Sequence, residues 1–161
     1  ALVLQGVLEK RGIQTRVQTA LNMHAIAEPY IRRRAQRHLN KGRVVIFGGG
    51  TGNPFFTTDT AAALRASEMD CDLMLMAKNG VDGVYSADPK TDSTATKFSA
   101  MTYDDVIQKN LKIMDTAALA LCRDKDLPIA VFDFAQAGAV RDLVSGLEVG
   151  TIISDTSKVT A

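Results

Sequence analysis

The sequence RVVIFGGGTGNPFFTTD, residues 43–59, decides the fold of this chain. It opens with an apolar, β-branched run at 44–47, continues through glycines at 48–50, and closes on Thr57, Thr58 and Asp59, which can cap a helix that begins at Thr60. Glycines let backbone N–H groups approach a phosphate closely, and a helix N-terminus adds unpaired donors. The spacing matches neither G-x-x-x-x-G-K-[ST] nor G-x-G-x-x-G. A phosphate-binding loop and a plain strand–turn–helix connection therefore both remain open.

The segments on either side of this stretch predict an α/β fold. We expect a helix at 60–69 and then a short apolar run at 73–77, which is typical of a buried parallel strand. Strand, helix and strand together make a βαβ unit. Before it we expect a helix at 1–11, a weak strand at 15–20, a loop at 21–28 and a helix at 29–39, with Pro29 in its first turn. After it we expect helices at 102–109, 115–125 and 137–145, strands at 128–132 and 151–154, and a polar tail at 155–161. Asp115 is either the cap of its helix or a ligand contact.

Composition limits the kinds of protein this can be. The 161 residues are 46% hydrophobic, enough for the core of one domain. A net charge of +1 indicates neither nucleic acid nor a membrane surface as a partner. Cys71 and Cys122 lie far apart in apolar segments, so we interpret them as buried thiols of a reducing compartment. The chain has no initiator Met and starts in a helical pattern, so we expect a missing N-terminal part.

Two groups of polar residues have alternative interpretations. Arginines at 32, 33, 34 and 37 fall mostly off the apolar stripe of the helix expected at 29–39. They form either a phosphate or nucleic-acid patch or a solvated or oligomer-contact face. The second is favoured because no interleaved aromatic residues accompany them. His24 and His38 have no partner at ligand spacing, so we predict no metal site there.

A second polar loop, KNGVDGVYSADP at 78–89, follows the apolar run. Asn-Gly and Asp-Gly pairs mark turns around a short extended piece at 84–85. Polar residues beyond the end of a strand are typical of a nucleotide site in α/β proteins. The alternative, slightly favoured on these residues alone, is an ordinary β-hairpin. The residues concerned are Lys78, Asn79, Asp82, Tyr85 and Asp88.

These motifs resemble those of the bacterial UMP kinase family, within the amino acid kinase superfamily. The resemblance lies in GGGTGNPFFTTDTAA at 48–62 and AKNGVDGVYSADP at 77–89. Related kinases for carbamate, acetylglutamate or aspartate share the fold but not TGNPFFTTD. Further matching pieces are Asn22-Met23, Glu28-Pro29-Tyr30, Ile113-Met114-Asp115, residues 128–132 and Gly150-Thr151-Ile152-Ile153.

The resemblance implies a three-layer α/β/α sandwich with a mostly parallel sheet. Residues 1–161 are expected to form a single domain, the C-terminal two-thirds of an amino acid kinase domain. The family's Lys-x-Ser-Gly loop, its second glycine-rich loop, its Arg for the UMP phosphate and its Asp for the UMP ribose would precede Ala1.

The resemblance also implies transfer of the γ-phosphoryl of ATP to UMP with Mg2+, giving UDP in cytoplasmic pyrimidine nucleotide biosynthesis. The family assembles as a homohexamer, is activated by GTP and inhibited by UTP, and has neither nucleic acid nor membrane as a partner. The alternatives are a non-catalytic uridine-nucleotide sensor of the same fold and a kinase acting on a small carboxylate or carbamate. TGNPFFTTD argues against the last.

Carried over to this chain, the family's motifs give three sets of site residues and no metal ligand. Asp59 is the candidate organiser of catalytic lysines or of Mg2+, and Lys78 the candidate positive charge at the transferred phosphoryl. The ATP contacts are Asn79, Tyr85 and Asp88. The UMP contacts are Thr51, Gly52, Asn53, Pro54, Phe55, Phe56, Thr57 and Thr58.

Overall fold

The computed structural model describes residues 1–155, which divide into two compact units, Ala1–Met69 and the described chain from Asp70 onward. The tail predicted at 155–161 lies, beyond Asp155, outside the described residues. None of the helices in residues 1–155 is both long and apolar enough to cross a bilayer. Each unit contains its own sheet, and the expectation of a single domain stays a prediction.

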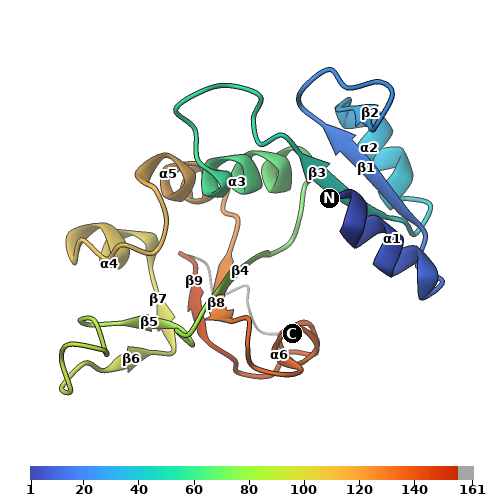
Figure 1. Ribbon diagram of the computed structural model, residues 1–161. Helices are drawn as coiled ribbons and strands as arrows, with labels where there is room; N and C mark the ends of the chain where they lie inside the picture. The colour runs from blue at the N-terminus through green and yellow to red at the C-terminus, as the bar shows by residue number, and fades with distance from the viewer. Residues whose placement is uncertain (156–161) are drawn as a thin grey trace. The chain divides into compact units, whose positions relative to one another are not determined.

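The first unit is built on a parallel three-stranded sheet in the order β2-β1-β3 (Figure 1). Its strands are β1 (Thr15–Thr19), β2 (Glu28–Pro29) and β3 (Val44–Gly48), with Thr15 opposite Val44 and Thr19 opposite Gly48. Its helices are α1 (Leu2–Lys10), α2 (Arg32–Leu39) and α3 (Thr58–Glu68).

Side chains on one face of this sheet hold α2. Gln18 on β1 and Glu28 on β2 lie opposite each other in the register. The Gln18 amide donates to the Glu28 carboxylate at 3.2 Å, and Nε2 of His38 lies 3.1 Å from the same oxygen. The Arg43 guanidinium donates to Nδ1 of His38 at 3.0 Å. A guanidinium can only donate, so Nδ1 is the acceptor and Nε2 carries the proton that faces Glu28.

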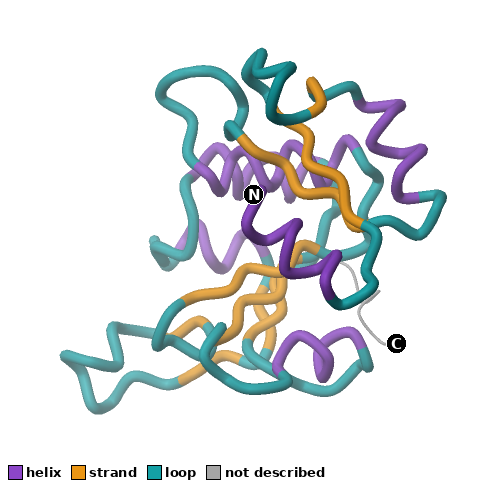
Figure 2. The backbone as a smooth tube through the Cα atoms, turned by 45° about the vertical axis from the view of Figure 1, so that its right-hand side comes forward, coloured by secondary structure: helices purple, strands orange, loops and turns teal. Residues whose placement is uncertain are grey.

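The second unit contains a four-stranded sheet in the order β4-β8-β9-β7. Figure 2 draws the strands of both units in orange. The strands are β4 (Met74–Lys78), β7 (Ala100–Met101), β8 (Ile129–Asp133) and β9 (Thr151–Ile153). β8 and β9 are antiparallel, whereas the other two pairs are parallel. A separate antiparallel pair joins β5 (Val84–Tyr85) to β6 (Lys97–Phe98). The helices are α4 (Tyr103–Gln108), α5 (Thr116–Asp124) and α6 (Ala139–Val144).

Helices cover both faces of the four-stranded sheet, which makes this unit a three-layer α/β/α arrangement. Ala130 and Phe132 on β8 pack against Ala139 and Leu143 of α6. Side chains alternate between the two faces of a strand, so the residues next to Ala130 and Phe132 face the opposite side of the sheet. On that side Met74 of β4 contacts the buried Cys122 of α5, with Sγ of Cys122 3.8 Å from Sδ of Met74. The predicted α/β fold with mostly parallel sheets is therefore confirmed.

Three predicted helix starts are wrong by two or three residues, and the helix expected from 137 begins at Ala139 as α6. The first turn of α3 begins at Thr58 and not at Thr60, because Thr57 is the N-cap and its Oγ1 accepts the Thr60 N–H at 3.2 Å. Pro29 is not in a helix. It ends the edge strand β2, where its lack of an N–H is tolerated, and α2 starts at Arg32.

The predicted environment of one cysteine is wrong, and the short strands β6 and β7 were not predicted, whereas β5 matches the extended piece expected at 84–85. Cys122 is buried, as predicted, but Cys71 is exposed because it lies in the turn between α3 and β4. β5 pairs with β6 across a loop at 86–96, and β7 pairs with β9 from far along the chain. Two-residue strands carry no period that a sequence could reveal.

Candidate functional site

The turn after β3 is built from glycines that the path of the chain requires. Gly49 and Gly52 have φ of +76° and +78°. A Cβ on Gly49 would lie 3.0 Å from Oγ1 of Thr19, and one on Gly52 would lie 3.2 Å from the carbonyl oxygen of Ala20. The loop therefore passes close to the carboxyl end of β1, and side chains at these two positions would displace it.

The predicted UMP-binding residues form the exposed part of this loop. Thr51 and Asn53 fold it locally: Oγ1 of Thr51 accepts the Asn53 N–H at 3.1 Å, and the Asn53 amide donates to the Thr51 carbonyl at 3.4 Å. Phe55 and Phe56 lie outside the core, with 103% and 56% of their surface exposed. Phe55 also has φ of +70°, which is uncommon for a bulky residue. Two adjacent exposed aromatic rings offer an apolar surface to a planar ligand.

The loop ends at the N-terminus of α3. Thr57 caps the helix, Thr58 is its first residue, and Asp59 lies in its first turn. A carboxylate at this position is stabilised by the helix dipole, so Asp59 has a structural role whether or not it acts in a reaction. The hydroxyl of the exposed Thr58 and the first-turn amides are donors of the kind that bind phosphate.

The second predicted loop starts at the carboxyl ends of two neighbouring parallel strands. Lys78 on β4 lies opposite Asp133 on β8. Oδ1 of Asp133 accepts the N–H of Gly80 at 3.2 Å and that of Ala135 at 2.9 Å, and the Phe134 N–H donates to the Lys78 carbonyl at 2.8 Å. These bonds fix the backbone beside Asn79, which is itself exposed. Ligands of α/β proteins commonly bind at such strand ends.

Tyr85 is held by a network that the sequence did not reveal. Its hydroxyl donates to Oδ1 of Asp82 at 2.6 Å, and the Lys97 ammonium lies 2.8 Å from Oδ2. The hydrogen bonds from Lys97 and then Tyr85 lower the pKa of Asp82, and the same carboxylate raises the pKa of Tyr85. Asp82 was noted as a loop residue, but nothing in the sequence pairs it with Lys97, fifteen residues later.

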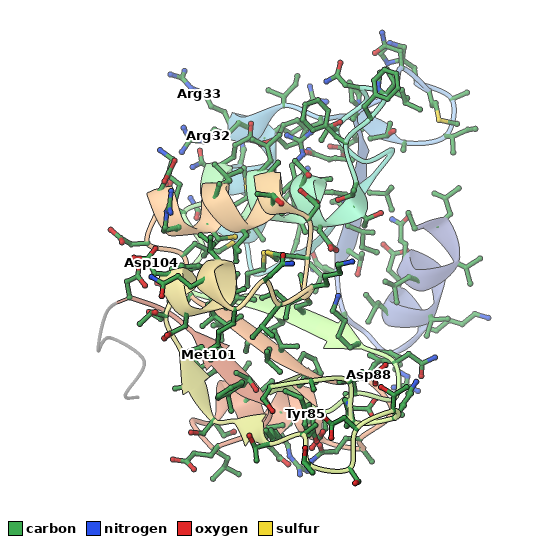
Figure 3. All side chains as sticks on the ribbon, turned by 90° about the vertical axis from the view of Figure 1, so that its left-hand side faces the viewer. Arg32, Arg33, Tyr85, Asp88, Met101 and Asp104 are labelled. Carbon is green, nitrogen blue, oxygen red and sulfur yellow. The ribbon has the colours of Figure 1, made fainter. Side chains whose placement is uncertain are left out.

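Asp88 occupies the start of a tight turn. Its Oδ1 accepts the Lys90 N–H at 2.9 Å, and its carbonyl accepts those of Thr91 and Asp92. Figure 3 shows Tyr85, the last residue of β5, and Asp88, in the loop between β5 and β6, at the same end of the second unit. Asp88 is exposed, so its second carboxylate oxygen faces solvent in the part of the chain described.

Two residues outside the predicted sets have structural roles in the second unit. Thr151 on β9 accepts the Val84 N–H through Oγ1 at 2.8 Å and donates to the Phe98 carbonyl at 2.5 Å. The hydroxyl thus ties both strands of the β5–β6 pair to the larger sheet. Asp115, which the sequence left as a cap or a ligand contact, accepts the Ala118 N–H at 2.9 Å as the N-cap of α5.

Together these loops offer hydrogen-bond donors, exposed aromatic rings and one lysine, but no activated nucleophile. Within residues 1–155 no three His, Cys, Asp or Glu side chains gather as a metal site. The first unit contains the Thr51–Asp59 residues, and the second contains Lys78, Asn79, Tyr85 and Asp88. Chemistry that depends on positioning and charge fits such residues.

Comparison with known proteins shows which family this chain resembles. Residues 1–133 match the model of the amino acid kinase family. The chain is 47% identical to a UMP kinase from Bacillus anthracis, with a TM-score of 0.94 over 97% of this chain. It is 35% identical to a UMP kinase from Ureaplasma parvum, with a TM-score of 0.91 over 96% of this chain. A uridylate kinase from Archaeoglobus fulgidus is 32% identical, with a TM-score of 0.64 over 78% of this chain.

The chain is shorter than these relatives. It covers 64% of the Bacillus protein, 66% of the Ureaplasma protein and 59% of the Archaeoglobus protein.

Proposed function

Since this chain belongs to the amino acid kinase family, we propose that its protein is a UMP kinase that transfers the γ-phosphoryl of ATP to UMP. The observation that carries the proposal is the loop from β3 to α3, with its required glycines, exposed phenylalanines and capped helix start. The 47% identity to a UMP kinase supports the same acceptor.

The loop of the first unit is the proposed acceptor site. Asn53 has an exposed amide that can donate to and accept from a uracil edge, while Phe55 and Phe56 supply apolar surface beside a base. Thr57 and Thr58 stand at the helix start, where a phosphate is stabilised by the first-turn amides and the dipole. Thr51, Gly52 and Pro54 shape the loop that presents these groups.

The loop of the second unit is the proposed ATP site. Asn79 and Asp88 are exposed polar groups for the adenosine part of the nucleotide, and Tyr85 offers a ring that Asp82 holds in place. A carboxylate accepts hydrogen bonds from ribose hydroxyls, as an oxygen of Asp88 can. Lys78 is half-buried at the end of β4, where its charge can act on a phosphoryl group.

Phosphoryl transfer needs groups that hold the two nucleotides in line and neutralise charge on the phosphate oxygens. Lys78 is proposed for charge neutralisation. Asp59 is proposed to orient a lysine or to hold Mg2+, which binds ATP phosphates together with one or two carboxylates. The ion supplies further positive charge at the phosphates when bound.

The expected pathway, assembly and regulation of the enzyme also belong to this proposal. They place the enzyme in cytoplasmic pyrimidine nucleotide biosynthesis, as a homohexamer that GTP activates and UTP inhibits. The resemblance to the family supports them.

The test is UDP formation from ATP and UMP by the protein at its natural length, with chain 1–161 assayed in parallel. We expect UDP from the natural-length protein, and no UDP when Mg2+ is removed by chelation. Binding of UMP without any UDP formation would favour the sensor alternative.

A further inference from the structure

Tyr30 contacts both the strand that enters the β3–α3 loop and the helix that leaves it. It follows β2 directly, and its N–H donates to the Thr19 carbonyl at 2.9 Å, which continues the parallel pairing with β1. Its backbone is therefore fixed by the sheet, while its side chain reaches two other elements of the first unit.

On the strand side, the Tyr30 ring packs against Phe47. The two ring centroids lie 5.5 Å apart and the planes meet at 81°, the edge-to-face geometry that aromatic pairs prefer. Phe47 immediately precedes Gly48, the last residue of β3. This contact fixes the chain where it enters the loop.

On the helix side, Tyr30 joins the last turn of α3. The Arg65 guanidinium lies over the ring, with Cζ 3.7 Å from the centroid. The Tyr30 hydroxyl donates to Oε2 of Glu68, and Arg65 donates to the same oxygen at 2.6 Å. The Glu68 carbonyl also accepts from Nε of Arg32 at 2.5 Å. A ring, a cation and a carboxylate thus hold one end of an eleven-residue helix to the sheet.

The Tyr30 hydroxyl stays protonated, and is therefore a hydrogen-bond donor, over the whole pH range in which enzymes work. Burial, and then the hydrogen bond to Glu68, raise the pKa of Tyr30 to about 12. The link between Tyr30 and α3 is therefore intact at neutral pH.

We propose that Tyr30 is a positioning residue that sets the spacing between the two ends of the acceptor loop. The start of the loop is held by the close approach of Gly49 and Gly52 to β1 and by hydrogen bonds between Thr51 and Asn53. The residues up to Thr58 are exposed, so their course also depends on where β3 ends and α3 begins. Tyr30 contacts both of these elements, through Phe47 on β3 and through the last turn of α3. Side chains that bind a ligand lose much of their contribution to affinity when they shift by even a small distance. The ligand of this loop, UMP, is taken from the proposed function. The anchoring of the loop by Tyr30 does not depend on that function.

The test compares Tyr30→Phe with Tyr103→Phe in the natural-length protein. Tyr30→Phe keeps the ring and removes only the hydroxyl bond to Glu68. Tyr103→Phe also removes one tyrosine hydroxyl bond, to the Leu127 carbonyl, but on α4 of the second unit. Amide hydrogen exchange of residues 49–57 and steady-state kinetics are measured for both.

We expect Tyr30→Phe to speed exchange of the 49–57 amides and to raise KM for UMP by about threefold to tenfold, with KM for ATP unchanged. Adding Glu68→Gln to Tyr30→Phe should add only the effect of losing the Arg65–Glu68 ion pair, because the Tyr30 bond to Glu68 is already gone. Tyr103→Phe should lower stability without altering either loop exchange or KM for UMP.

Two outcomes separate the anchoring from the proposed function. If loop exchange and KM for UMP in Tyr30→Phe match those of Tyr103→Phe, the positioning role is wrong. If the wild type neither binds nor phosphorylates UMP, the proposed function fails, and loop exchange alone still decides whether Tyr30 anchors the loop.

Discussion

A Cβ placed on Gly150 would lie 2.0 Å from the carbonyl oxygen of Val131, on the neighbouring strand β8. Gly150 also has φ of +78° and directly precedes β9. No side chain fits there, because the obstructing atom belongs to the backbone of a buried strand. The Gly-Thr pair at 150–151 is thus needed to bring Thr151 to the β5–β6 pair.

Gly150→Ala should therefore lower the free energy of unfolding by at least about 3 kcal/mol. The measurement is urea unfolding followed by circular dichroism. Gly80→Ala is the matched control, since Gly80 has φ of +70° but nothing within 4 Å of its Cβ position. It should cost only about 1 kcal/mol, and equal losses for the two variants would contradict the steric argument.

Asn53→Ala should raise KM for UMP about tenfold while leaving KM for ATP unchanged, because an amide that pairs with the base is removed. The amide bonds the Thr51 carbonyl only weakly, at 3.4 Å, so little loop structure is lost with it. Asn40→Ala, at the C-cap of α2, is the control and should alter neither constant. An unchanged KM for UMP in Asn53→Ala would remove Asn53 from the acceptor site.

Asp88→Ala should raise KM for ATP and not KM for UMP. Because Asp88 also accepts the Lys90 N–H, loss of the turn has to be separated from loss of a ligand contact. Asp88→Asn keeps an oxygen for that N–H but removes the charge. Raised KM for ATP in both variants supports a direct contact, whereas an effect of Asp88→Ala alone would indicate a role in loop structure. An effect confined to UMP would show that the two sites are exchanged.

Asp82 gives a prediction for the effect of pH on stability. Its pKa in the folded protein is lowered from the ordinary 3.8, chiefly by the Lys97 hydrogen bond. The pair therefore stabilises the fold above that ordinary value, and the stabilisation is lost as pH falls through the folded pKa. Urea midpoints of the wild type should fall more steeply from about pH 5 to about pH 2 than those of Asp82→Asn. Parallel slopes would show that the pair contributes nothing.

Much of the fold could be predicted from short-range patterns. Thr102 and Asp105 form a capping box at the start of the helix predicted at 102–109, and Asp115 caps α5. Runs of apolar residues marked β3, β4 and β8, because strands of parallel sheets are commonly apolar on both faces. β8 is almost wholly buried, whereas β3 is exposed or half-buried along its length. Helix caps and apolar strand segments depend mainly on residues close together in the chain, so a short stretch of sequence is enough to predict them.

The sequence failed where a distant partner decides the structure. Pro29 belongs to β2 because Thr19 pairs with it, and Lys97 matters because Asp82 faces it. Tyr30 was noted only as part of a family motif, whereas its contacts with Phe47, Arg65 and Glu68 depend on two other elements, β3 and α3. Contacts between residues far apart in the chain leave no regular pattern in the sequence.

The acceptor is the central claim, and it is tested most directly by measuring kcat/KM with ATP for UMP, CMP, carbamate, N-acetylglutamate and aspartate in the natural-length protein. The account predicts that UMP exceeds each of the others by at least about a hundredfold, because the loop at 51–58 offers groups for a uracil nucleotide. Comparable or greater activity with CMP, or with any of the small carboxylates or carbamate, would contradict it.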